Sequence, residues 1–291
     1  MNIERIKVIV RENKFVRAIS LPFAMMKRNY DLNRYNSSMD SKFIAGLNNK
    51  YQGESCFIIG NGPSLTPRDL DKIQKYNVPS FGSNRIYHIY EQTTWRPTFY
   101  ISLDVYGLSN LEEFDRIRNS GRYIKFLNYK AAKHGRKPED NIHYIFTYGR
   151  FKINPYVMES GELSEDCSKH VSKTATVTAN AIELAIYMGF KKIYLLGVDN
   201  NYARKKLANG KIIRDGSIKT SYFAGMKDTN GKPGDGFSVQ VVDFMNEAYE
   251  ICNEYATTHG IKIYNATRGG KLEIFERVDF DEVIKAFGRI K

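Results

Sequence analysis

The sequence has few of the residues that build covalent or metal-bound frameworks. Its 291 residues include only three cysteines and five histidines. The cysteines lie far apart and form no C-x-x-C pair, which excludes a disulfide framework and offers no obvious zinc site. The histidines show no metal-ligand spacing. We therefore expect reduced thiols, a cytoplasmic protein and no bound metal. The cysteines are Cys56, Cys167 and Cys252.

Long hydrophobic runs are also missing. No stretch of 18 apolar residues occurs, as a membrane-spanning helix would require. Charged residues interrupt the N-terminus repeatedly, so it lacks the apolar core of a secretory signal peptide. No internal repeat is evident. We expect no membrane-spanning segment, and the length allows one large α/β domain with additions, or two small domains.

Positive charge is in excess. The 44 lysines and arginines outnumber the 32 aspartates and glutamates, which gives a net charge of +12. A basic surface attracts nucleic acid, anionic lipid or an anionic substrate. Because the basic residues are spread along the chain and no nucleic-acid motif is present, we expect no nucleic-acid partner.

Residues 1–50 differ from the rest of the chain in composition. Between Met1 and Asn36, eight basic and three acidic residues lie among apolar ones. Such a basic amphipathic stretch is typical of a helix on an anionic membrane surface, and equally of a helix that packs on the core or in a homo-oligomer. We expect a linker at Ser37–Ser41 and a single domain over residues 51–291.

Beyond residue 50, short apolar runs alternate with helical patterns. This alternation is typical of a Rossmann-like α/β fold with a mainly parallel, doubly wound sheet. Residues 207–238 have weak periodicity and predict a lid loop, in which Tyr222 is placed to close over a ligand. We expect strands at residues 56–59, 78–81, 99–103, 123–127, 142–146, 192–196 and 261–264, and helices at residues 67–76, 111–119, 178–188 and 244–257.

Small and polar residues follow several of the predicted strands. The turn Gly60-Asn61-Gly62-Pro63-Ser64 can bring backbone N–H groups close to a phosphate or nucleotide, although a tight turn with nothing bound is the alternative. Thr174–Thr178 suits a phosphate cradle, unless Thr178 is a plain N-cap. Ligands of open α/β sheets bind at the carboxyl ends of strands, where we expect these residues to converge: Asn61, Asn84, Asp104, Asp199 and Asn265.

Four segments carry a family resemblance. Phe57–Leu65, Phe81–Asn84, Leu195–Asp199 and Ile263–Phe275 resemble the motility accessory factor family, whose core domain is shared with archaeal-type 6-hydroxymethylpterin diphosphokinases. The Gly-Asn-Gly-Pro-Ser-Leu turn is also similar to that of bacterial surface-glycan sialyltransferases, which use CMP-sialic acid. The resemblance covers Gly53 to Val283 in order and spacing. It implies a Rossmann-like, nucleotide-binding catalytic domain at residues 51–291.

The resemblance also implies roles for individual residues. Asn61 and Asn84 match asparagines that hold the nucleotide donor, and Tyr202 falls near tyrosines that stabilise the leaving phosphate. The segment Thr176-Val177-Thr178 matches the stretch that approaches the donor's phosphate. Asn265, Ala266 and Thr267 belong to the last motif, beside the cytidine. All of these are expected to bind the donor together with the turn residues Gly60, Gly62, Pro63 and Ser64.

The sequence departs from the sialyltransferases at the catalytic base. Where they place a histidine, the best-matching stretch here offers Tyr222, and an ordinary tyrosine pKa near ~10 makes a poor base at neutral pH. Asp104 and Asp199 are therefore the candidate catalytic carboxylates, beside Tyr202 and Tyr222.

Three functions fit these residues. The first is a glycosyltransferase that uses a CMP-linked acidic sugar and a glycan acceptor in bacterial surface glycan synthesis, with no cofactor required. The second is pyrophosphoryl transfer from ATP, with Mg²⁺ held by Asp104 and Asp199. The third is a non-catalytic nucleotide- or glycan-binding module. Peripheral attachment to the inner face of the membrane and a homo-oligomer both stay open.

Overall fold

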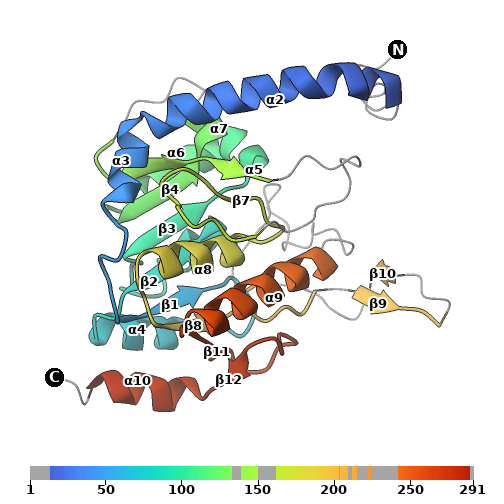
Figure 1. Ribbon diagram of the computed structural model, residues 1–291. Helices are drawn as coiled ribbons and strands as arrows, with labels where there is room; N and C mark the ends of the chain where they lie inside the picture. The colour runs from blue at the N-terminus through green and yellow to red at the C-terminus, as the bar shows by residue number, and fades with distance from the viewer. Residues whose placement is uncertain are drawn as a thin grey trace.

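The computed structural model describes residues 14–132, 139–149, 162–202, 204–208, 212–214, 222–223 and 242–288 (Figure 1). The expected lid at residues 207–238 lies for the most part outside the described residues. So do residues 1–13 of the expected N-terminal extension.

A parallel sheet forms the centre of the protein. Every pair of neighbouring strands in it is parallel, which confirms the predicted Rossmann-like α/β fold. The eight strands of this sheet follow the order β12 (Glu276–Arg277), β11 (Lys262–Asn265), β8 (Lys192–Leu196), β1 (Ser55–Ile59), β2 (Ser80–Ser83), β3 (Phe99–Ser102), β4 (Ile124–Asn128) and β5 (Ile142–Ile145).

Two hydrophobic cores, one on each face, explain why the strands read as continuous apolar runs. Cys56 and Ile58 of β1 belong to one core, whereas Phe57 and Ile59 belong to the other. Strands buried on both faces gain apolar burial at every position. The sheet is therefore doubly wound, as predicted.

Helices cover both cores. On one face, α8 and α9 lie side by side across the sheet (Figure 1). The helices on that face are α3 (Met39–Ala45), α8 (Val177–Tyr187) and α9 (Val242–Thr258). Those on the other are α4 (Pro67–Lys75), the 3₁₀ helix η1 (Asn84–Ile89), α5 (Val105–Ser109), α6 (Leu111–Asn119), α7 (Tyr129–Ala132) and α10 (Phe280–Gly288).

The chain changes direction at β1. From β1 it builds strands toward β5, and it later returns to place β8 on the other side of β1 before continuing to β11. The loops after β1 and β8 therefore lead away from each other. At such a switch point the carboxyl ends of two adjacent strands leave an opening for a ligand.

The described part of the N-terminal segment packs on the domain, which is one of the alternatives that its composition predicts. It forms α2 (Lys14–Asn36) and then α3, and the predicted linker at Ser37–Ser41 is wrong. The Ser38 side chain accepts a hydrogen bond from the Ser41 N–H at 3.2 Å, so this serine is the N-cap of α3. Ile44 and Leu47 are buried in the same core as α8 and α9.

Two small sheets complete the described structure. In one, β6 (Thr147–Tyr148) pairs in parallel with β7 (Val171–Ser172). In the other, β9 (Arg204–Lys206) pairs antiparallel with β10 (Ile212–Arg214), at the beginning of the expected lid. Among the described residues, no helix is both long and apolar enough to cross a membrane.

Candidate functional site

A cavity opens to solvent at the switch point of the sheet. Sites for small ligands in open α/β sheets occur at such switch points. The walls come from the residues after β1, β2 and β8, from the first residues of α8 and α9, and from Tyr222. The lining residues are Gly60, Asn61, Gly62, Ser83, Asn84, Ala175, Thr176, Val177, Thr178, Gly197, Val198, Asp199, Asn200, Asn201, Tyr202, Tyr222, Met245 and Tyr249.

Most of the predicted site residues meet at this cavity. The structure brings together Gly60, Asn61, Gly62, Asn84, Thr176, Val177, Thr178, Asp199, Tyr202 and Tyr222. It does not place Pro63, Ser64, Asp104, Asn265, Ala266 or Thr267 in the lining. Asp104 is exposed just before α5, so the expected convergence of five polar strand ends is reduced to Asn61, Asn84 and Asp199.

The turn after β1 uses its backbone differently from the phosphate-binding turn that the sequence predicts. The N–H group of Gly60 donates to the Leu196 carbonyl at 2.8 Å, and that of Gly62 donates to the Gly197 carbonyl at 2.8 Å. The Ser64 N–H donates to the Asp199 carboxylate at 3.3 Å. These N–H groups hold the turn against the segment after β8 and are not directed at a ligand.

Close approach of two backbones explains the glycines of this turn. A Cβ atom on Gly60 would lie 2.3 Å from the Gly197 carbonyl oxygen, and one on Gly62 would lie 1.9 Å from Oδ2 of Asp199. Neither glycine has a positive φ. Glycine is therefore needed at both positions for packing and not for a left-handed backbone.

Asp199 joins the two turns. Its Oδ2 atom accepts from the Ser64 hydroxyl at 2.7 Å, while Oδ1 accepts from the Ser64 N–H. The side chain is largely buried, and burial raises the pKa of this carboxyl although both bonds from Ser64 act in the opposite direction. A carboxylate offers about four lone-pair sites, so two remain for a ligand or a proton.

The last motif lies behind the β8 turn. The Thr267 hydroxyl accepts from the Val198 N–H at 3.1 Å, and the Lys271 N–H donates to the Asp199 carbonyl at 2.7 Å. Asn265 is buried, and its amide donates to the Leu272 carbonyl and accepts from the Thr267 N–H. The last motif therefore positions Val198 and Asp199. The resemblance instead implies that Asn265, Ala266 and Thr267 lie beside the nucleotide.

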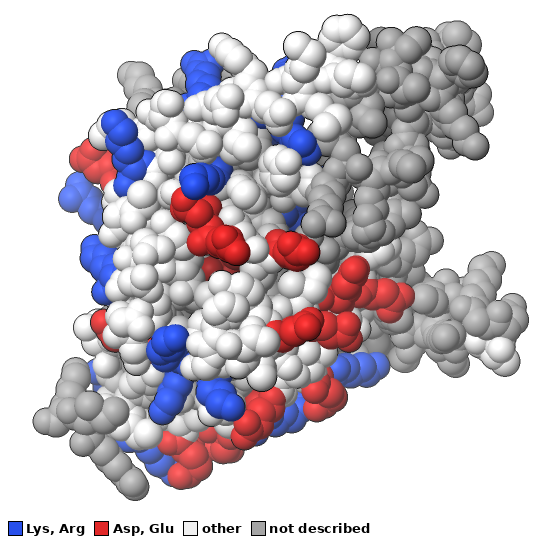
Figure 2. All heavy atoms as spheres, viewed as in Figure 1, with Lys and Arg blue, Asp and Glu red and all other residues white. Residues whose placement is uncertain are grey.

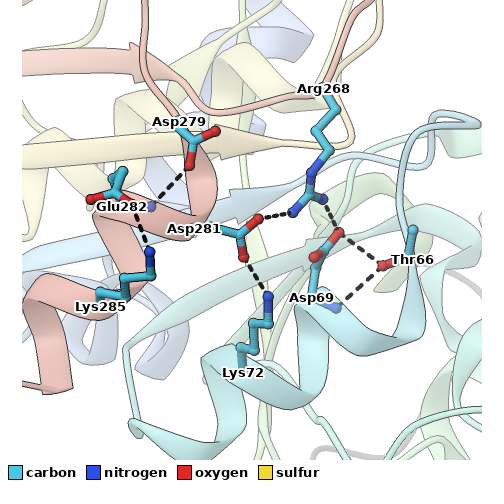
Figure 3. Close-up of polar contacts among 8 residues, drawn as sticks. All are labelled: Thr66, Asp69, Lys72, Arg268, Asp279, Asp281, Glu282 and Lys285. Atoms are coloured by element: carbon cyan, nitrogen blue, oxygen red, sulfur yellow. Dashed lines mark hydrogen bonds and ion pairs between the residues drawn. The ribbon is translucent and has the colours of Figure 1, made fainter.

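An ion-pair network fastens this motif from outside (Figure 3). Arg268 pairs with the buried Asp69 of α4 and, at 2.9 Å, with Asp281 of α10. Lys72 pairs with the same Asp281. Pairing with Asp69 is the main cause that raises the Arg268 pKa. The network joins α4, the loop after β11 and α10, and none of its residues is among those that line the cavity.

The opposite wall is the start of α8. Thr176 is the N-cap, and its hydroxyl accepts from the Thr178 N–H at 3.3 Å. Thr176 also shares a hydrogen bond with the Tyr249 hydroxyl at 3.3 Å. The cap is therefore Thr176 and not Thr178. The helix dipole still makes this end of α8 favourable for an anion.

A buried carboxylate holds the segment that leads into α8. Glu183 is 2% exposed and accepts from the Ser164 N–H at 2.8 Å, from both donors of Ser172, and from Asn180 at 3.2 Å. Burial nevertheless raises the pKa of this carboxyl. Glu183 fixes β7 and the following residues, including Thr176, to the helix.

Three amide oxygens distinguish the cavity from an ordinary turn region. The Oδ1 atoms of Asn61, Asn200 and Asn201 are buried and accept no hydrogen bond from the part of the chain that the structure describes. The Nδ2 of Asn61 is fixed on the Ser83 carbonyl at 3.1 Å, and that of Asn200 on Asn246 at 2.8 Å. Buried acceptors are nearly always satisfied, so each of these oxygens needs a hydrogen-bond donor from outside the described residues.

Three tyrosines, Tyr202, Tyr222 and Tyr249, complete the lining. Burial raises the pKa of Tyr202 and that of Tyr222 above the usual value near 10. Burial also raises the pKa of Tyr249. All three hydroxyls keep their protons at neutral pH, so they can donate hydrogen bonds but cannot serve as bases.

Sequence reasoning missed several lining residues. Asn200 and Asn201 directly follow Asp199, and their position at a strand end could have identified them. Asn200 and Asn84 have φ values of 51° and 49°, a left-handed conformation that asparagine tolerates, so backbone geometry accounts for part of their residue type. Tyr249 lies within the apolar pattern of α9, and nothing in the sequence separates it from a core residue.

The expected metal ligands do not assemble. Within the described residues, no group of three or more His, Cys, Asp or Glu side chains is arranged to hold a metal ion. Of the two carboxylates proposed for Mg²⁺, Asp199 lines the cavity and Asp104 does not. The described residues therefore do not fit a magnesium site built on this pair.

The solved structures similar to this chain include two transferases. No curated protein matches the sequence. The MAf glycosyltransferase from Magnetospirillum magneticum AMB-1 aligns with 86% of this chain, at 11% identity and a TM-score of 0.45, and the chain spans only 41% of its length. The sialyltransferase CstII from Campylobacter jejuni, solved with the substrate analogue cytidine-5'-monophosphate, aligns with 78% of this chain and 85% of its own, at 15% identity and a TM-score of 0.41.

A family model matches the part of the chain that forms most of the cavity. It covers residues 31–205, which is more than half of the chain and includes β1, β2, α8, β8 and the turns that line the cavity. The resemblance to 6-hydroxymethylpterin diphosphokinases is thereby confirmed, and three of the four sequence segments lie within the match, whereas Ile263–Phe275 lies beyond it. The chain belongs to the MptE-like family, described as 6-hydroxymethylpterin diphosphokinase MptE-like.

Proposed function

We propose that the protein is a glycosyltransferase that binds a CMP-linked acidic sugar in this cavity and transfers the sugar to a glycan acceptor of the bacterial surface. The observation that carries the proposal is the set of buried amide oxygens of Asn61, Asn200 and Asn201. Each needs a hydrogen-bond donor. A nucleoside supplies several donors, whereas a fully ionised phosphate supplies none.

The amide oxygens favour particular parts of a nucleotide. Ribose hydroxyls and an exocyclic amino group can donate to them, and cytosine carries such an amino group. Uracil presents an acceptor oxygen at the same position, which would face an amide oxygen unfavourably. Because the Nδ2 atoms of Asn61 and Asn200 donate to the protein, Oδ1 is in each amide the atom that lacks a partner among the described residues.

The donor's phosphate fits the opposite wall. At Val177 and Thr178 the start of α8 offers a favourable end of the helix dipole. The protonated hydroxyls of Tyr202 and Tyr222 can donate to the oxygen that keeps the electron pair when the bond between sugar and phosphate breaks. Donors that strengthen as charge develops lower the barrier to this step.

The acceptor's proton needs a base. Asp199 is the one carboxylate among the described lining residues, and burial raises its pKa, which makes it a stronger base than an exposed aspartate. Ser64 anchors it without using all of its lone pairs. We assign Asp199 this role, and Asp199→Asn should abolish transfer while leaving nucleotide affinity within about threefold, because the amide keeps the shape.

The family description favours a second candidate, the transfer of a pyrophosphoryl group from ATP. Such a reaction depends on Mg²⁺ to neutralise the phosphates. The described residues do not bring Asp104 and Asp199 together for this purpose. We therefore rank it below sugar transfer.

The two candidates differ in the nucleotide they bind. Thermal unfolding should be measured with CMP, UDP, GDP and ATP, each with and without Mg²⁺. Sugar transfer predicts that CMP raises the melting temperature most, without Mg²⁺. Stabilisation by ATP only with Mg²⁺ would overturn sugar transfer in favour of the second candidate.

Turnover separates an enzyme from a binding module. Release of CMP from CMP-sialic acid in the presence of mixed glycan acceptors should exceed the rate without protein, and Asp199→Asn should remove the excess. If CMP binds and no donor is turned over with any acceptor, the protein is a nucleotide-binding module.

A further inference from the structure

One face of helix α2, which we call the inner face, packs against the domain. Arg28 stacks on the Tyr148 ring at 4.3 Å and donates to the Gly149 carbonyl at 3.3 Å. Tyr35 is fully buried and contacts the rings of Tyr129 and Phe146. Residues 28, 31, 32 and 35 are the intermediate and buried positions of α2, and their spacing is that of one helix face.

The face away from the domain is apolar. Phe23 is 70% exposed, Met26 68% and Tyr30 67%. Residues three and four apart share a helix face, so these side chains form one stripe, which we call the outer stripe. Scattered exposed apolar residues are ordinary, but three in register on one helix mark an interaction surface.

Basic residues accompany the outer stripe. Lys27 and Arg34 are exposed and continue its spacing, at four residues from Phe23 and from Tyr30. The acidic residue of this part of α2, Asp31, lies on the inner face. Figure 2 shows acidic and basic spheres mixed over the body of the domain, whereas the described edge along α2 is white and blue.

The apolar and basic side chains of the outer face indicate which kind of partner would bind there. Aromatic and methionine side chains flanked by cations suit the boundary between the headgroups and acyl chains of an anionic bilayer. A second copy docked through the same face would oppose Lys27 and Arg34 to their own counterparts, and like charges in contact are unfavourable. Charge therefore favours an anionic surface over self-association.

We propose that the outer stripe of α2, with Lys27 and Arg34, docks the protein on an anionic lipid surface. The inner face keeps α2 on the edge of the domain at β5, so lipid binding would need no rearrangement of the sheet. This inference does not depend on the proposed function, because neither the cavity nor its lining takes part.

Vesicle sedimentation of the full chain tests the proposal. Vesicles of phosphatidylcholine with about 30% phosphatidylglycerol should retain the protein, and vesicles of phosphatidylcholine alone should retain much less. The variant Phe23→Ser/Met26→Ser/Tyr30→Ser and the variant Lys27→Glu/Arg34→Glu should each lower the apparent affinity at least about tenfold, since each basic residue near an anionic surface contributes roughly fivefold.

Matched controls keep the result specific. Leu111→Ser removes a side chain that is 68% exposed on α6, and Lys192→Glu/Lys262→Glu reverses two exposed charges at the other end of the sheet. Both should bind anionic vesicles within about twofold of the parent, and circular dichroism confirms that each variant is folded.

Two outcomes would overturn the proposal. The first is that the parent protein does not bind anionic vesicles, or that both stripe variants bind them as tightly as the parent does. The other is a concentration-dependent dimer in analytical ultracentrifugation that the stripe variants abolish, which would assign the surface to a second copy of the chain.

Discussion

The cavity has two sides that differ in how their polar groups are used. On the supporting side, the backbone of Gly60–Ser64, the carboxylate of Asp199 and residues 265–271 bind one another. On the open side, Asn61, Asn200, Asn201, Tyr202 and Tyr222 line the cavity, and the amide oxygens of the three asparagines lack a partner among the described residues. The most conspicuous motif of the sequence is thus mainly scaffold, and Asn61, between its two glycines, is the part of it available to a ligand.

This difference predicts that a change on the supporting side costs stability first. Gly62→Ala should have the largest effect, a loss of about 3 kcal/mol or more in the free energy of unfolding, because its Cβ would overlap the Asp199 carboxylate. Urea denaturation measures it.

Gly53→Ala is the matched control for Gly62→Ala. Gly53 has a φ of 84°, and no atom lies within 4 Å of the position that a Cβ would take there. Only the left-handed backbone penalty of about 1 kcal/mol therefore applies. Equal losses in the two variants would contradict the close approach of the two turns.

Glu183 extends the comparison to the wall formed by α8. Both of its oxygens accept hydrogen bonds, so the amide nitrogen of Glu183→Gln would face a donor in either orientation. We expect a loss of about 2 kcal/mol in the free energy of unfolding by urea denaturation. The exposed Glu254→Gln should change it by less than about 0.5 kcal/mol, and similar values for both would remove Glu183 from the support.

A change on the open side should affect catalysis more than stability. Under the proposed function, Tyr202→Phe removes a donor to the leaving phosphate, and we expect kcat to fall about tenfold to a hundredfold with little change in the donor KM. Tyr264→Phe, on β11 and outside the lining, is the control. A KM effect without a kcat effect would assign Tyr202 to ground-state binding.

Tyr202 also gives a pH dependence. Because burial raises its pKa in the folded protein above the unfolded value near 10, the folded state holds the proton more tightly. Stability should therefore fall as the pH rises above about 10, and Tyr202→Phe should make that fall shallower. Unfolding by urea at pH 9 and pH 11 measures the difference, and an identical slope in both proteins would contradict it.

The smallest effect is expected at the outer network of Figure 3. The Arg268 side chain is partly exposed, and solvent screens its pairs with Asp69 and Asp281. Arg268→Gln should lower the free energy of unfolding by about 1 kcal/mol or less. A larger loss in urea denaturation would show that the network supports the β8 turn from outside.

The sequence predicted the strands and helices of the domain well, because strands buried on both faces are continuous apolar runs that can be recognised in the sequence. The strand at β8 and the helix at α6 have the predicted bounds, and the parallel sheet follows from their alternation. The linker prediction failed at Ser38, which is the N-cap of α3. Serine is common both at helix N-caps and in loops, so it indicates a cap only when the helix that follows it has been recognised.

The site was predicted in part for a different reason. A glycine records that a side chain is excluded there, but not whether a ligand or another backbone excludes it, and at Gly62 the cause is Asp199. The sequence also does not show which distant residues form hydrogen bonds with one another. The resemblance therefore places Thr267 beside the ligand, although its hydroxyl accepts a hydrogen bond from the Val198 N–H. Tyr249 was hidden within the apolar face of α9.

The difference between the two sides is tested most directly by calorimetric titration of CMP into the parent, Ser64→Ala and Asn201→Ala. We predict that CMP binds the parent without Mg²⁺, that Asn201→Ala weakens binding about tenfold, and that Ser64→Ala leaves the Kd within about twofold while lowering the free energy of unfolding by about 1 kcal/mol. Weakening of CMP binding by Ser64→Ala as great as by Asn201→Ala, or no binding of CMP to the parent, would contradict it.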